Sequence, residues 1–315
     1  MPLSLRRGAV TAVLERQEGL ARIEVDGAPC VAYPLLTGPV ALGDDVIVNT
    51  QARDLGLGSG GFDVLYANLT RGLGLHAEAG AHVVKLPYTP GQVALRHAEE
   101  DGPLADSLEG MPVVCCSLHS QLAPVCAALA GRRVVYVQLE GGALPAALSD
   151  TVRELKERRL VEAVATVGPC FGGDVECVSV WSALAWAKAQ GAEASVCAIG
   201  PGIVGTGTRL GHGGTAAATA ANAALALGGR AILAARLSDA DPRHRHRGFS
   251  HHTRAVLDLV REEVAVGENG EGWEEACAGL SLSHMGRGPD EDPAFFAAAY
   301  AAGRLACQAL ESARP

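Results

Sequence analysis

Short apolar runs alternate with helix-forming stretches from Met111 onward, and this alternation limits the possible folds more than any other feature of the chain. Each run is rich in β-forming residues and is followed by a polar or glycine-rich loop. Strands that alternate with helices in this way indicate parallel βαβ units. We therefore predict an α/β fold with a doubly wound, mostly parallel sheet of about six strands.

The predicted strands are five clear runs and a weaker sixth, namely Pro112–Cys116, Arg133–Val137, Ala163–Val167, Ser195–Ile199, Ala231–Ala235 and Leu280–Ser283. The predicted helices span Gln121–Ala130, Asp150–Arg159, Val175–Gln190, Gly214–Leu227, His251–Glu263 and the alanine-rich stretch from Pro293 to Glu311. Ser149 and Ser250 are predicted N-caps, because a serine hydroxyl accepts a hydrogen bond from the first helical turn.

The remainder of the chain predicts a small β-barrel-like domain and a connecting segment. We divide the chain into a barrel-like domain at residues 1–52, a transition segment with extra strands at 53–110 and an α/β ligand-binding domain at 111–315. Glu18-Gly19 and Asp26-Gly27 are typical hairpin turns. Phe62–Leu69 and His82–Leu86 are the extra strands. We interpret the barrel as a structural or oligomerisation module of a candidate homo-oligomer, although small barrels also bind ligands or nucleic acids.

Charge and composition restrict the class of protein. The net charge of -9 argues against general nucleic-acid binding, because a phosphate backbone would be repelled. The sequence has no uninterrupted apolar run of about 18 residues, so we expect no membrane segment. We also expect no signal peptide at Met1–Arg7. The nine cysteines are scattered and include no C-x-x-C pair, which predicts reduced, mostly buried thiols in a cytoplasmic protein.

A glycine-rich loop spans Gly200–Gly214, directly after a predicted strand. In open parallel sheets, ligands bind outside the carboxyl ends of the strands, where this loop is expected. Its free backbone N–H groups suit a phosphate or carboxylate. The candidate ligand-binding residues here are Gly200, Gly202, Gly205, Thr206, Gly207 and Thr208. A structural glycine turn is the main alternative; a dinucleotide site fits poorly, because the predicted helix starts too late for the fingerprint.

A second polar loop, Ser238–Thr253, is rich in arginine and histidine. Five arginines and two aspartates between Arg236 and Arg254 give this stretch a formal charge of +3. Fixed positive charges favour an anionic ligand, for which the candidate residues are Arg243, Arg245, Arg247, Ser250 and His252. A divalent-metal site is an alternative, with Asp239, Asp241, His244 and His246 as its ligands. A salt-bridged structural loop is the third reading.

Candidate catalytic groups lie in further loops that follow strands. His119, Asp174 and His251 are the residues expected to supply acid–base chemistry. Asp174 has an alternative role as a carboxylate stabilised at a helix N-terminus. Cys170 is a candidate nucleophile or a packed core thiol. The sequence contains no G-x-S-x-G, H-E-x-x-H or EF-hand motif, which disfavours the common hydrolase classes, and it indicates no particular cofactor.

Four strings in the chain resemble a known family, and the likeness extends over nearly the whole chain. They are Gly61–Leu69 (GFDVLYANL), Ile199–Thr208 (IGPGIVGTGT), Arg247–Thr253 (RGFSHHT) and Met285–Phe296 (MGRGPDEDPAFF). The family is a bacterial one, catalogued as domain of unknown function 3866. The resemblance implies a bacterial, intracellular protein but assigns no reaction and no catalytic residue, so any site must be inferred from the loops.

The converging loops favour an enzyme that acts on a small anionic metabolite, either phosphorylated or carboxylated. The arginines and the glycine-rich backbone would hold the anion, and the histidines or Asp174 would transfer protons. Two alternatives remain open: a non-catalytic regulatory module that binds a metabolite or nucleotide, and a divalent-metal hydrolase that uses the Asp239–His252 loop.

Overall fold

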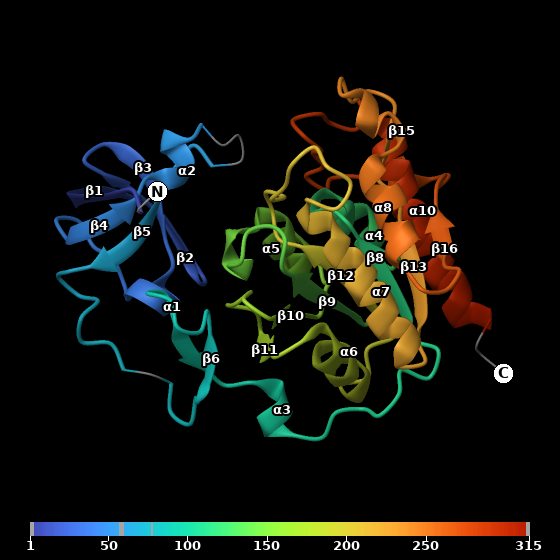
Figure 1. Ribbon diagram of the computed structural model, residues 1–315, viewed down its shortest axis with the longest axis horizontal. Coiled ribbons are helices and arrows are strands. Elements are labelled where there is room, and N and C mark those ends of the chain that lie inside the picture. The colour runs from blue at the N-terminus through green and yellow to red at the C-terminus, as the bar shows by residue number, and fades with distance from the viewer. Residues whose placement is uncertain (1–2, 57–59, 77, 313–315) are drawn as a thin grey trace. The chain divides into compact units, whose positions relative to one another are not determined.

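A computed structural model of the protein describes residues 3–56, 60–76 and 78–312. The chain forms two compact units, Met1–Arg96 and His97–Pro315. Each unit has its own buried core. Figure 1 shows the course of the chain through both units.

The first unit is a closed five-stranded barrel. Its strands are β1 (Leu5–Gln17), β2 (Leu20–Val25), β3 (Ala28–Ala32), β4 (Asp45–Asn49) and β5 (Asp63–Asn68), in the order β1-β2-β3-β5-β4. The β3–β5 pair is parallel and the other pairs are antiparallel. This arrangement is that of an OB-fold barrel. The predicted barrel is therefore present, and its fifth strand comes from the segment at Phe62–Leu69.

Turn chemistry and alternating burial explain the barrel. Asp26 and Gly27 both have positive φ, at 49° and 75°, which a tight hairpin turn between β2 and β3 requires. Along β4, Val46 and Val48 are buried while their neighbours are partly exposed, as expected for a strand with one face on a core. The unit also contains α1 (Pro34–Thr37), α2 (Gln51–Asp54), β6 (Val83–Lys85) and β7 (Val93–Leu95).

The second unit is built on a seven-stranded sheet in which every pair is parallel. Its strands are β8 (Pro112–Cys116), β9 (Val134–Leu139), β10 (Ala163–Val167), β11 (Val175–Cys177), β12 (Ala194–Ile199), β13 (Arg230–Ala234) and β16 (Ala265–Gly267), in the order β11-β10-β9-β12-β8-β13-β16. Every residue of β8 is buried, as is typical of a strand covered on both faces.

Helices cover both faces of the sheet (Figure 1). The longer ones are α4 (Leu122–Ala128), α5 (Asp150–Glu157), α6 (Val180–Ala189), α7 (Ala216–Ala226), α8 (His251–Leu259) and α10 (Pro293–Ser312), with α3 (Ala98–Asp101) and α9 (Trp273–Ala276) as short additions. Helices α6, α7 and α8 pack in one core with Val113 of β8, whereas α4, α5 and α10 pack in the other with Val114. The sheet is therefore doubly wound, as predicted.

The strand order reverses around β8, and this reversal fixes where a ligand is expected. The chain leaves β8 into α4 on one face and leaves the neighbouring β12 and β13 into α7 and α8 on the other. Ligand sites of doubly wound folds lie outside the carboxyl ends of the strands at such a point. The loops after β8, β12 and β13 therefore flank the expected ligand position.

Several element boundaries differ from the predictions. The sequence predicted a strand at Leu280–Ser283, but this segment is not a strand, and the sheet instead ends on the three-residue β16. The helix predicted to begin at Val175 begins at Val180, because Val175–Cys177 pairs with β10 as β11. Both predicted N-caps are confirmed: Ser149 accepts from the N–H of Val152, and Ser250 from that of His252.

Two further expectations concern cysteines and membranes. All nine cysteines are buried and none is in a disulfide, as predicted, and burial raises the pKa of Cys115 to about 12. Cys170 is fully buried, which fits the packed alternative better than a nucleophile. Among the described residues, no helix is both long enough and apolar enough to cross a membrane.

Candidate functional site

The glycine-rich loop after β12 and the histidine-rich loop after β13 are in contact. The ring of His212 stacks on that of His252 with their centroids 3.7 Å apart. A Cβ placed on Gly207 would lie 3.9 Å from the guanidinium carbon of Arg245. The two loops predicted to form the walls of one site therefore lie side by side at the carboxyl edge of the sheet.

Close backbone packing shapes the glycine-rich loop. A Cβ on Gly200 would stand 2.0 Å from the carbonyl oxygen of Ala143, so only glycine fits there. The N–H of Thr206 donates to the carbonyl of Gly211 at 2.7 Å, which folds the tip of the loop into a hairpin. The hydroxyls of Thr206 and Thr208 lie 2.9 Å apart. The structural explanation thus accounts for Gly200, while Gly207 and the two threonines remain at the open tip.

Four histidines form one cluster, which we call the histidine cluster: His212, His246, His251 and His252. Beside the stacked pair, the centroid of His251 lies 5.5 Å from that of His212 and 4.4 Å from that of His252. The centroid of His246 lies 4.8 Å from that of His251. His251 is partly exposed and the other three are buried, so the cluster has one side open to solvent.

Hydrogen bonds orient the rings of the histidine cluster. Nε2 of His212 lies 3.0 Å from the carbonyl oxygen of Arg209, so Nε2 donates and Nδ1 keeps its lone pair. Nδ1 of His212 and Nε2 of His251 are buried and have no hydrogen-bond partner among the described residues. Nδ1 of His252 accepts from Nη1 of Arg236 at 3.0 Å, because a guanidinium only donates. Nδ1 of His246 is bonded to the hydroxyl of Ser250 at 2.8 Å.

The cluster is uncharged at neutral pH. Burial, with the charge of the neighbouring Arg236, lowers the pKa of His252 to about 2 and that of His246 to about 3. Burial also lowers the pKa of His212 and of His251. Neutral imidazoles carry a lone pair and can act as ligands. The low pKa values of His252 and His246 make those two rings weak bases, so His212 and His251 are the better proton acceptors of the cluster.

A buried ionic centre lies beside the cluster. Arg236 is 1% exposed and faces Asp241, with Nη2 3.5 Å from Oδ2. Arg243 donates to both oxygens of Asp241, at 2.9 and 2.8 Å, and Arg287 reaches Oδ2 at 3.4 Å. Burial alone would raise the pKa of Asp241, but the hydrogen bonds from Arg243 outweigh it and hold the pKa well below its usual value.

The interleaved arginines of the histidine-rich loop have different environments. Arg243 is bound to the carboxylate of Asp241, and Nε of Arg247 donates to the backbone carbonyl of the same residue at 3.1 Å. Arg245 is exposed beside Gly207 at the tip of the glycine-rich loop. Of the three predicted anion ligands, Arg245 is thus the one whose guanidinium faces the open junction of the two loops.

A family model described as "Protein of unknown function (DUF3866)" matches residues 29–269, which is well over half of the chain. The chain belongs to the DUF3866 family. A search of curated proteins finds no match. The region shared with the DUF3866 family contains Arg236 and all four members of the histidine cluster, whereas the fourth string that suggested the resemblance, Met285–Phe296, lies outside it.

In this DUF3866 protein, the residues of the alternative metal set do not gather around one point. Asp241 is enclosed by three arginines, while Asp239 and His244 are exposed. Only His246 of that set belongs to the histidine cluster. The described part of the chain instead brings a ring nitrogen from each of His212, His251 and His252 within 4.8 Å of one another.

Two of the predicted catalytic residues lie outside the histidine cluster. Both ring nitrogens of His119 are bonded, Nδ1 to the carbonyl of Ile199 at 3.1 Å and Nε2 to the hydroxyl of Ser149 at 2.7 Å. Asp174 accepts from the N–H of Val164 at 2.8 Å and pairs with Lys156, which places it near the amino end of β10. Asp174 precedes a strand rather than the predicted helix, so it faces away from the carboxyl edge.

The prediction of the site missed four polar residues: His212, Arg236, His284 and Asp292. His212 stands alone between glycines, far along the chain from the other histidines, and Arg236 follows β13 at the carboxyl edge. The sequence signals that could have found them are the place of His212 in the glycine-rich loop and that of Arg236 directly after a predicted strand. His284 stacks on Phe295 at 3.7 Å and is bonded to the hydroxyl of Ser120 at 3.2 Å.

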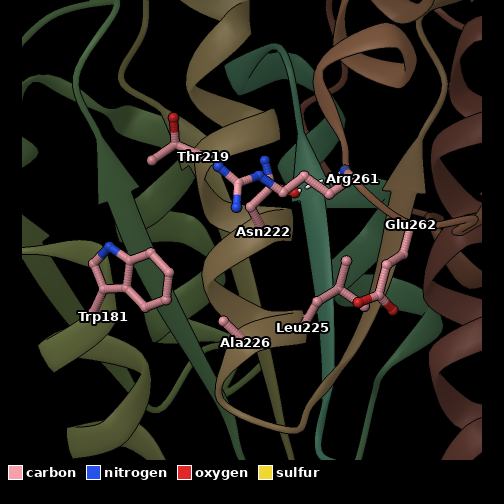
Figure 2. A pocket seen from close by; sticks show the side chains of 7 residues that line it. All are labelled: Trp181, Thr219, Asn222, Leu225, Ala226, Arg261 and Glu262. Atoms are coloured by element: carbon pink, nitrogen blue, oxygen red, sulfur yellow. Dashed lines mark hydrogen bonds between the residues drawn. The ribbon is translucent and has the colours of Figure 1, made fainter.

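A hollow on the helical face of this DUF3866 protein is separate from the histidine cluster. It has a volume of about 360 Å³ and is lined by residues of α6, of α7 from Thr219 onward and of the segment after α8 (Figure 2). His212 precedes α7. Figure 2 shows the side chain of Arg261 extending over Asn222, with Trp181 on the opposite side. Its lining includes no histidine, cysteine or aspartate, so the candidate site remains the junction of the two loops.

Proposed function

We propose that the protein is an enzyme that acts on a small anionic metabolite, phosphorylated or carboxylated, at the junction of the histidine cluster and the glycine-rich loop. The observation that carries this proposal is Arg236: it is 1% exposed, and its Nε has no hydrogen-bond partner among the described residues. A buried guanidinium with an unused donor is costly unless a ligand satisfies it. An anion is the ligand that a guanidinium prefers.

The charge balance around Arg236 supports an anion. Among the described residues, the three arginines of the ionic centre, Arg236, Arg243 and Arg287, face only two carboxylates, those of Asp241 and Asp292. The exposed Arg245 adds another positive charge at the tip of the two loops. A cation would be repelled unless an anion accompanied it, whereas an anion would restore the balance.

The histidine cluster supplies the acid–base chemistry that the proposal requires. His251 was a predicted catalytic residue, and its partly exposed ring is the member that a ligand from solvent meets first. His212 presents an unpartnered Nδ1 whose opposite nitrogen is held by a backbone carbonyl, as in an oriented general base. We assign proton transfer to this pair. His119 holds the loops after β8 and β9 together instead.

A binding screen with small anions tests the proposal. Metal-free protein is heated with inorganic phosphate or with small mono- and dicarboxylates, and we expect phosphate to raise the melting temperature. A ligand at 100 times its Kd stabilises the folded state by about 2.7 kcal/mol, which such a screen detects. If no phosphorylated or carboxylated compound shifts the melting temperature at millimolar concentration, the proposal is wrong. If a ligand binds but is not converted, the protein is the non-catalytic binding module instead.

A pair of arginine variants locates the anion. Arg245→Met removes the exposed charge at the loop tip and should weaken phosphate binding at least tenfold, because a charge-assisted hydrogen bond is worth about 1.5–3 kcal/mol. Arg254→Met is the matched control, since Arg254 is exposed on α8 one residue after Thr253. Titration calorimetry measures both. Equal Kd values for the two variants would contradict the proposed position of the anion.

We also infer a bacterial protein that works in the cytoplasm. The likeness to a bacterial family supports the origin. The nine cysteines are all buried and none is in a disulfide, which supports a reducing compartment.

A further inference from the structure

We propose that His212, His251 and His252 form a binding site for a divalent transition metal of the zinc type. One ring nitrogen of each of these residues lies within 4.8 Å of those of the other two. Neutral imidazoles suit zinc, copper and nickel, whereas calcium and magnesium prefer oxygen ligands. This proposal adds a cofactor to the proposed function and rests on that function for the role of the metal. Its test is independent of the test of the proposed function.

Two of the three histidines have an unpartnered ring nitrogen that a metal could use. Nδ1 of His212 and Nε2 of His251 are buried without a partner among the described residues, and the two rings are inclined at 74°. Nε2 of His212 donates to the carbonyl of Arg209, which fixes both the tautomer and the direction of the ring. Metal-bound histidines characteristically donate their second nitrogen to a carbonyl or carboxylate in this way.

His252 is the third ligand, and it has a competing partner. Its Nδ1 accepts from Arg236, so in the structure its Nε2 carries the proton. A metal can bind at Nε2 only in the other neutral tautomer, so the proton moves to Nδ1 and the hydrogen bond from Arg236 is lost. The stacking of His252 on His212, inclined at 16°, also has to open for both rings to bind one ion. We therefore expect His252 to contribute less to affinity than His212 and His251.

The spacing requires a small contraction. Zinc–nitrogen bonds are about 2.0–2.1 Å long, so nitrogens around a tetrahedral ion stand about 3.3 Å apart. The nitrogens, which lie up to 4.8 Å apart, must therefore approach by as much as about 1.5 Å, which ring rotation can provide. Three histidines leave a fourth position for water or an anionic substrate. An anion there would also offset the repulsion between the ion and Arg236.

Metal titration tests the proposal directly. Protein treated with a chelator and then dialysed is titrated with Zn²⁺ by calorimetry and with Co²⁺ by visible absorption. We expect one equivalent of metal per chain with a Kd of micromolar or lower, and the strong visible bands of tetrahedral Co²⁺. Binding of less than half an equivalent, or a Kd in the millimolar range, would overturn the proposal.

Three variants identify the ligands. His251→Ala changes a partly exposed residue and should weaken Zn²⁺ binding at least thirtyfold; His212→Gln should do the same, with a melting curve to verify folding. His244→Ala removes an exposed histidine of the alternative set and should leave the Kd within twofold of wild type. Zinc binding that survives both His212→Gln and His251→Ala, or that is lost in His244→Ala, would refute the assignment.

The metal and anion proposals fail separately. If metal-free protein binds phosphate but the protein does not bind zinc, only the metal proposal is wrong. If the protein binds zinc but binds no anion, either in its metal-free or in its zinc-bound form, only the proposed function is wrong. Arg245→Met provides a cross-check, because it should weaken phosphate binding and leave the Zn²⁺ stoichiometry at one per chain.

Discussion

Asp241 is the residue on which the ionic centre depends, because a single buried carboxylate faces Arg236, Arg243 and Arg287. Asp241→Asn would leave the buried Arg236 without a counter-charge. Breaking a buried ion pair by removing one partner costs about 3–5 kcal/mol, so we expect a loss of about 3 kcal/mol in urea unfolding.

Asp239→Asn, two residues earlier and exposed, is the control for this change and should alter stability by less than about 0.5 kcal/mol. Equal effects of the two variants would show that Arg236 is not held by the carboxylate of Asp241.

His119 makes a prediction about pH. Burial lowers the pKa of His119 to about 4, although its hydrogen bond to the carbonyl of Ile199 has a smaller opposing effect. The pKa of a histidine in an unfolded chain is about 6.5. Below pH 6.5 the unfolded chain therefore binds more protons than the folded one. Stability due to this residue is complete above pH 6.5 and is lost as the pH falls toward 4, by about 3 kcal/mol in total.

The measurement is the pH dependence of unfolding in wild type and His119→Gln. The glutamine variant should be less stable at pH 7.5, but its stability should fall less steeply between pH 6.5 and 4. Parallel pH profiles for the two proteins would mean that His119 does not titrate as its burial implies.

At the scale of elements, Gly200 and Gly207 of the glycine-rich loop differ in how much room each has for a side chain. A Cβ at Gly200 meets the carbonyl oxygen of Ala143 at 2.0 Å, and neither can move without shifting backbone, whereas a Cβ at Gly207 makes only an ordinary contact with Arg245. We expect Gly200→Ala to cost about 2 kcal/mol or more and Gly207→Ala about 0.5 kcal/mol or less in urea unfolding. A tolerated Gly200→Ala would contradict the close packing of this loop.

Pattern and length determined which elements could be predicted. The strands β8 and β10 were predicted at their observed bounds, because each is a bounded run of buried residues. The three-residue strands β11 and β16 were missed, since so short a segment shows no periodicity, and Val175–Cys177 merges into the apolar pattern of α6. Because a helix was predicted to begin at Val175, Asp174 was assigned to the carboxyl edge of the sheet.

At the scale of the whole molecule, the sequence predicted at which edge of the sheet the site lies, but not which residues form it. Alternating strands and helices place the polar loops at one edge by a general rule. The contact of His212 with the His251–His252 pair depends on the strand order, in which β12 and β13, consecutive in the chain, lie on either side of β8. A single sequence does not contain that order.

We propose that an anionic ligand binds where the histidine cluster meets the glycine-rich loop. The most direct measurement follows the ring nitrogens of the histidines by two-dimensional ¹H–¹⁵N NMR while metal-free protein is titrated with inorganic phosphate. We predict that the signals of His212, His246, His251 and His252 shift with a common Kd, while that of His119 does not. Saturation of the protein with phosphate without any shift in these four signals would contradict the claim.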